Sequence, residues 1–116
     1  MCSEVCIFVK VSRLEELQAK VTAYPEDPFW PHVLGMQLMG MGRWAEAEAA
    51  FQEALRRDPR HHPSYYQLGL LYEATGREND AITAFREGAR IAADVRDLAL
   101  LKDFRAKLRL YLGLDE

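Results

Sequence analysis

Cysteine and long apolar runs are scarce in this chain of 116 residues, and each scarcity excludes a class of protein. Both cysteines, Cys2 and Cys6, stand within the first six residues, so they cannot cross-link a domain or form a metal site without further ligands. The apolar run Val5–Val9 is far too short to span a bilayer, and no basic stretch precedes it as in a signal peptide. We therefore expect a soluble cytoplasmic protein that does not contact a membrane.

Charge of one sign is not in excess either, since 15 basic residues face 18 acidic ones and the net charge is -3. This balance does not suggest nucleic-acid binding. The three histidines, His32, His61 and His62, lack the spacing of metal ligands, and the chain has no nucleophile-elbow, zinc-protease or phosphate-loop motif. We expect no catalytic residue, no metal and no cofactor, and hence a protein that is not an enzyme.

The chain does contain an internal repeat with an offset of 34 residues. At this offset Leu34-Gly35 aligns with Leu68-Gly69, and large and small residues of the following segment align as well. These residues suit a pair of helices that cross closely, with small residues at the crossing and a large apolar residue between the helices. A period of this length indicates a stacked helical array. The repeat-defining core predicted from the alignment is Leu34, Gly35, Ala47, Phe51, Ala54, Leu68, Gly69, Tyr72, Ala81, Phe85 and Gly88.

The two copies resemble the tetratricopeptide repeat, whose pattern runs W-x2-L-G-x2-Y, then A-x3-F, then P. The second copy has Tyr65 at the tryptophan position and Ala93 where proline is usual, whereas the first has Pro31 at the tryptophan position and keeps Pro59. The resemblance implies an all-α fold, a right-handed superhelical array of antiparallel helix pairs with about five helices. We expect the first repeat over residues 28–61 and the second over 62–95, with turns at Gly42 and Gly76.

Residues outside the two copies are expected to cover the ends of the stack, because a repeat is completed only by its neighbour. Downstream, an apolar stripe at three- and four-residue spacing predicts a capping helix over residues 96–112. Upstream, Ser12 and Glu15 resemble a capping box, which predicts a helix over residues 12–24. This helix is either the return half of a degenerate repeat, with Leu17 at the position of Phe51, or an unrelated cap.

Residues 1–11 are expected to form an N-terminal tail. Their alternation of apolar residues is typical of extended chain, with three alternatives: a disordered tail, a segment packed on its own domain, or a contact with another copy.

In tetratricopeptide arrays the first helix of each repeat lines a groove that holds a peptide or helix of another protein. The resemblance therefore assigns a set of mostly apolar peptide-groove candidates: Phe29, His32, Met36, Met39, Tyr66, Leu70 and Glu73. Methionine and tyrosine suit an apolar ligand, whereas His32, Met36, Tyr66 and Leu70 cannot grip a terminal carboxylate as lysine and arginine do in some members. The alternative is that some of these side chains are core.

The sequence thus predicts a non-catalytic protein–protein interaction module that binds an apolar peptide or helix of a partner protein. The alternative is a subunit that completes its helical stack in a homo-oligomer or a larger assembly. The basic segment 56–62 is explained without a ligand, since cations complement the carboxyl end of a helix and His61-His62 falls in the turn between repeats.

Overall fold

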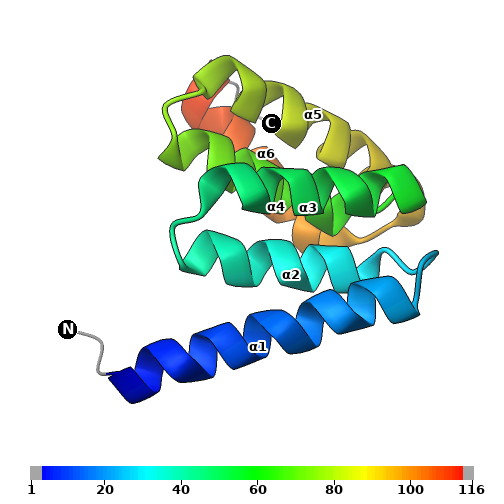
Figure 1. Ribbon diagram of the computed structural model, residues 1–116. Coiled ribbons are helices and arrows are strands. Elements are labelled where there is room, and N and C mark those ends of the chain that lie inside the picture. The colour runs from blue at the N-terminus through cyan, green and yellow to red at the C-terminus, as the bar shows by residue number, and fades with distance from the viewer. Residues whose placement is uncertain (1–3, 114–116) are drawn as a thin grey trace. The chain divides into compact units, whose positions relative to one another are not determined.

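A computed structural model describes residues 4–113 of the chain, with side chains from Ser12 onward. The described residues form six helices and no strand, which confirms the all-α class and exceeds the expected helix count by one (Figure 1). They fall into two compact units that divide after Asp58. The N-terminal unit contains α1 (Glu4–Ala23), α2 (Phe29–Gly40) and α3 (Trp44–Arg57), and the C-terminal unit contains α4 (His62–Ala74), α5 (Glu78–Val95) and α6 (Leu98–Leu112).

Each repeat is a helical hairpin closed by a glycine turn. Gly42 and Gly76 adopt positive φ angles of 74° and 76°, in the left-handed region that a side chain disfavours. At the crossing of α2 and α3, a Cβ placed on Gly35 would lie 2.6 Å from the Phe51 ring, and a Cβ on Gly69 would overlap the Phe85 ring in the same way. The paired helices approach so closely because a glycine faces a buried aromatic ring.

Most of the repeat-defining residues are buried. Phe51, Phe85 and three alanines, at positions 47, 54 and 81, are fully buried, and Leu68 is nearly so. The three glycines, Gly35, Gly69 and Gly88, are buried as well, whereas Leu34 and Tyr72 are only partly buried. The alignment of the two copies therefore marks the interior of each hairpin.

The N-terminal tail is a correction to the sequence prediction, because α1 already begins at Glu4 (Figure 1). Ser12 and Glu15 consequently lie inside a helix and do not cap its start. The segment before Ser12 has no proline or glycine, and extending an existing helix costs far less than nucleating one, so the short alternating pattern did not decide the structure. Residues 1–3, with Cys2, lie outside the described residues.

Helix α1 packs on α2 through its own apolar stripe. Leu14 and Leu17 are 5% and 3% exposed, so Leu17 occupies a buried position as its alignment with Phe51 requires. Arg13, aligned with the fully buried Ala47, is exposed instead. The half-repeat alignment therefore accounts for the buried Leu17 but not for the exposed Arg13.

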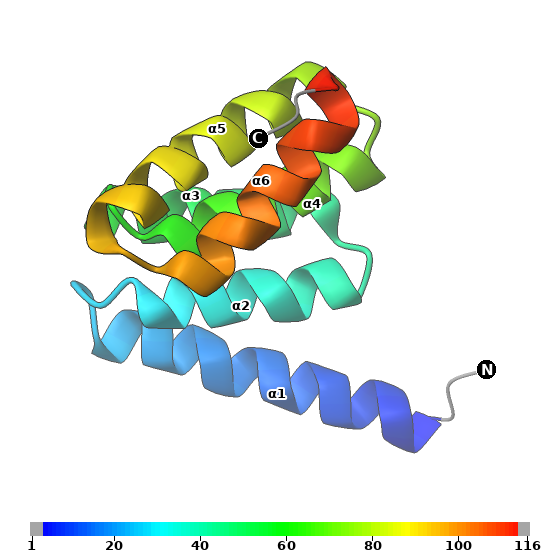
Figure 2. The ribbon, with the colours of Figure 1, turned by 180° about the vertical axis from the view of Figure 1, so that it is seen from behind.

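Helix α6 covers the C-terminal unit and contributes to its core (Figure 2). Leu101 and Phe104 are buried together with Ala81, Phe85 and Ala92. Lys102 and Asp103, which align with the buried Leu68 and Gly69, are exposed. Helix α6 therefore does not continue the repeat pattern on its outer side, as the sequence predicts for a capping helix.

Candidate interaction surface

The groove candidates of α2 are partly open to solvent. Phe29 and Met36 are 50% and 43% exposed, whereas His32 and Met39 are only partly exposed. The His32 ring lies 5.7 Å from the Phe51 ring, so it packs against the hairpin interior. Of these four residues, Phe29 and Met36 present the most apolar surface.

The groove candidates of α4 are covered by α6. The Tyr66 ring lies 5.3 Å from the Phe104 ring and 5.8 Å from that of Phe85. Leu70 packs against the same cluster. Helix α6 therefore occupies the surface of α4 that the resemblance assigns to a ligand.

Glu73, the third candidate on α4, is also engaged by α6. Its carboxylate accepts a hydrogen bond from Lys107 Nζ at 3.0 Å and another from the Tyr111 hydroxyl. Burial, together with the neighbouring carboxylate, raises the pKa of Tyr111 to about 12. The sequence showed that α6 is amphipathic but carried no signal that Lys107 and Tyr111 would bind Glu73.

An aromatic cluster that the sequence analysis missed lies where α1 meets α2. The Trp30 ring stacks on Tyr24 at 6.1 Å and meets Phe29 edge-on at 5.0 Å. Lys20 Nζ lies 5.5 Å from the centroid of the Trp30 ring and 5.7 Å from that of Tyr24, within range of a cation–π interaction. Lys20 and the rings of Phe29 and Trp30 border a hollow of about 320 Å³ between the two helices.

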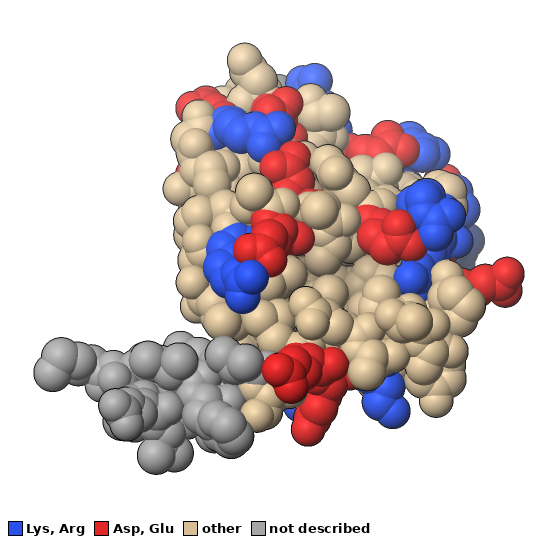
Figure 3. All heavy atoms as spheres, in the orientation of Figure 1, with Lys and Arg blue, Asp and Glu red and all other residues tan. Residues whose placement is uncertain are grey.

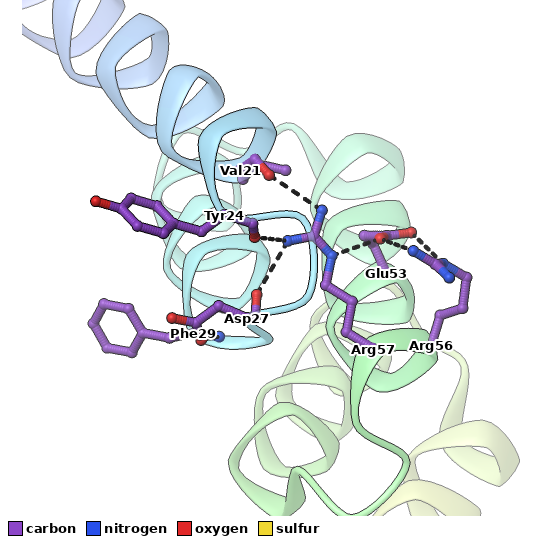
Figure 4. Close-up of polar contacts among 7 residues, drawn as sticks. All are labelled: Val21, Tyr24, Asp27, Phe29, Glu53, Arg56 and Arg57. Atoms are coloured by element: carbon purple, nitrogen blue, oxygen red, sulfur yellow. Dashed lines mark hydrogen bonds and ion pairs between the residues drawn. The ribbon is translucent and has the colours of Figure 1, made fainter.

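The basic segment at the end of α3 has structural partners (Figure 4). Arg57, whose side chain is 7% exposed, donates hydrogen bonds to the backbone oxygens of Tyr24 and Asp27 at 2.8 and 3.1 Å, and to that of Val21 at 3.3 Å. Arg57 also donates a hydrogen bond to the carboxylate of Glu53, and Arg56 donates another to the same carboxylate. Hydrogen bonds from Arg56 and then Arg57 lower the pKa of Glu53 to about 2.

Both histidines after this segment are likewise engaged. His61 Nδ1 lies 2.8 Å from the Ser64 hydroxyl, and His62 Nε2 lies 2.8 Å from the carboxylate of Asp97. Asp97 also accepts the backbone N–H of Leu100 and so caps α6. The bond from His62 is the main cause that lowers the pKa of Asp97.

Two searches of the described residues bear on chemistry and on membranes. Among the side chains the structure describes, no three of the types histidine, cysteine, aspartate and glutamate gather as a metal site would require. None of the described helices combines the length and apolar character needed to cross a bilayer.

The paired helices, the glycine–aromatic crossings and the 34-residue register define a helical-repeat protein. A family model for the tetratricopeptide repeat matches residues 32–95, more than half of the chain. The chain therefore belongs to the tetratricopeptide repeat family, whose members are in general non-catalytic modules of protein–protein interaction. No curated protein matches it.

Solved structures agree with this assignment. The crystal structure of a tetratricopeptide repeat domain protein from Salinibacter ruber is 29% identical, with a TM-score of 0.69, over 77% of this chain and 99% of that one. A solution structure of such a domain from the same organism is 30% identical, with a TM-score of 0.70, over 79% and 93% of the two chains. MamA, 20% identical with a TM-score of 0.64 over 88% of this chain and 66% of its own, shares the fold.

Proposed function

We propose that this protein is a non-catalytic interaction module in which the exposed side of α2 binds an apolar peptide or helix of a partner protein. The observation that carries the proposal is the half-exposed state of Phe29 and Met36. Seven residues apart on a helix, they lie on one side of it and about 10 Å from each other along the axis. That spacing matches two anchor side chains of a ligand helix.

The chemistry of the neighbouring residues favours an apolar ligand. Aromatic residues and methionine are enriched in the buried centres of protein interfaces, and Tyr24, 49% exposed, extends the surface next to Phe29 through Trp30. Helix α2 has no lysine or arginine, so it offers no side chain that would grip an anionic chain terminus.

The C-terminal unit supports a helix as the form of the ligand. There the amphipathic α6 lies on Tyr66 and Leu70, the residues of α4 that align with His32 and Met36 of α2. The first helix of a repeat of this type can therefore hold an amphipathic helix on the side where these aligned residues lie.

Site-specific photo-cross-linking tests the proposal. A photoreactive phenylalanine analogue at position 36 should capture a partner from the native cell, whereas the same analogue at the exposed Ala45 should not. Met36→Glu should then weaken binding of the identified partner at least tenfold, because a carboxylate would be desolvated in an apolar contact. Ala45→Glu is the matched control, since it adds the same charge in the first turn of α3, where the helix dipole favours it.

Equal capture at both positions, or unchanged binding by Met36→Glu, would contradict the proposal. Sedimentation over a range of concentrations tests the alternative, self-association of the chain. If the captured protein is a second copy and Met36→Glu abolishes a concentration-dependent dimer, the α2 surface completes a homo-oligomer instead.

A further inference from the structure

The outer side of α6 carries a row of exposed cations. Lys102, Arg105 and Arg109 follow one another at spacings of three and four residues, so they form a row on one side of the helix. All three are exposed, as is Leu98 at the start of the row. We call this row, with Leu98 and Ala106, the basic stripe.

The cations of the basic stripe have no ion pair with any residue that the structure describes. Several arginines of other helices and turns are paired locally, as Arg43 is with Glu46 and Arg90 with Glu87. On the face drawn in Figure 3, cations and acidic side chains lie side by side in the same way. Helix α6 carries four cations and the single acidic residue Asp103, in a chain whose net charge is -3.

The repeat register aligns the start of this stripe with buried positions of α4. Leu98, Lys102 and Arg105 align with Ser64, Leu68 and Leu71 of α4, which are buried. On α6 the aligned residues border a shallow hollow of about 350 Å³ whose lining comes from α6 alone. A helix docked there would therefore lie on α6 much as a return helix lies on the first helix of a repeat.

The chemistry of the stripe selects the kind of helix. Asp103 stands where Gly35 and Gly69 permit close crossing, so a docked helix must lie farther from α6 than α3 lies from α2. Long side chains bridge that larger separation, and the three cations require carboxylates. We infer that the basic stripe binds an acidic amphipathic helix of a partner protein, with glutamates facing the cations and a leucine stripe facing Leu98 and Ala106.

A designed peptide pair tests this inference. The probe is an 18-residue helical peptide with a leucine stripe flanked by glutamates, and its control has lysine in place of every glutamate. Fluorescence anisotropy should show that the glutamate peptide binds and that the lysine control does not. Raising NaCl from about 50 to about 500 mM should weaken the affinity for the glutamate peptide roughly tenfold, because exposed ion pairs are screened.

Matched variants of the protein locate the binding. R105E/R109E should lose at least tenfold affinity for the glutamate peptide, whereas R13E/R86E, which changes the net charge equally at exposed positions on other helices, should bind as wild type does. R105Q/R109Q removes the same two positive charges without adding negative ones, so its loss of affinity for the glutamate peptide should be intermediate. Circular dichroism checks that each variant keeps its helical content.

The inference would be overturned by no binding of the glutamate peptide, by equal loss in both charge-reversal variants, or by unchanged affinity of R105E/R109E. A concentration-dependent dimer of wild type that R105E/R109E abolishes would assign the stripe to a second copy and overturn the partner helix. Because Met36→Glu leaves the stripe intact, it should bind the glutamate peptide normally, so the inference and the proposed function fail separately.

Discussion

The hydrogen bonds of Arg57 predict that one buried cation anchors the carboxyl end of α1 to α3. Its guanidinium donates to the backbone oxygens of Val21, Tyr24 and Asp27 and to the carboxylate of Glu53 (Figure 4). Arg57→Met keeps an unbranched apolar stem of similar reach but removes all of these bonds. The substitution should therefore loosen α1 while preserving the packing around the stem.

The expected loss follows from the number and exposure of the acceptors. Hydrogen bonds to backbone oxygens contribute roughly 0.5–1 kcal/mol each when water can replace the donor, as it can at the exposed Tyr24 and Asp27. With the bond to Glu53, Arg57→Met should cost about 2–3 kcal/mol. For a domain of this size that lowers the thermal midpoint by about 10 °C.

Arg56 provides the matched control, because it is the adjacent residue, is of the same type and bonds the same Glu53. Its side chain is 68% exposed, so Arg56→Met should leave the midpoint within about 2 °C of wild type. Arg57→Lys should be intermediate, since an ammonium cannot reproduce the planar fork of the guanidinium.

The assays are thermal unfolding followed by circular dichroism and amide hydrogen exchange. In Arg57→Met, exchange should accelerate first in α1, because the broken bonds hold Val21 near its end and Tyr24 directly after it. Equal midpoints for Arg57→Met and Arg56→Met would refute the reasoning, as would a loss of protection spread evenly over α2 and α3.

Two further predictions concern a helix crossing and acid stability. Gly88→Ala should destabilise the protein by about 1–3 kcal/mol in urea unfolding, because the added Cβ would overlap the Phe104 ring. Gly40→Ala, with open space around it, should be neutral or slightly stabilising. Equal effects of the two substitutions would contradict this account. Hydrogen bonds from Arg56 and Arg57 lower the pKa of Glu53 to about 2. The contribution of Glu53 to the free energy of unfolding is therefore complete above about pH 4.5 and is lost as the pH falls toward 2. In that window Glu53→Gln should show a smaller fall of unfolding free energy than wild type, and parallel curves would count against the ion pairs.

The hairpins could be predicted because their determinants lie within one 34-residue repeat. Pro28 stands at the start of α2, and Gly42 and Gly76 turn the chain at positive φ. A left-handed turn and a close crossing each require a particular residue type, so they leave a trace in the sequence. The helix of residues 4–11 left no such trace, since extension of a helix needs only the absence of breakers.

The candidate surface was less predictable, because register shows which side of a helix a residue lies on but not what covers it. Met36 and Leu70 are aligned, yet Met36 is 43% exposed whereas Leu70 packs against the core that includes Phe104. The engagement of Glu73 by Lys107 likewise joins residues 34 positions apart in different helices. Neither contact could be inferred without the position of α6.

That position does follow from a symmetry shared by all antiparallel hairpins: residues equally distant from the turn face each other. Gly35 meets Phe51 about the turn at Arg43, Gly69 meets Phe85 about Arg77, and Gly88 meets Phe104 about Arg96, each pair being sixteen residues apart. Comparison at an offset of 34 finds the first two pairs, because they repeat each other, and misses the third, which joins a return helix to the helix after it. A search for glycine and phenylalanine placed symmetrically about each turn would have found all three and would have placed α6 against α5.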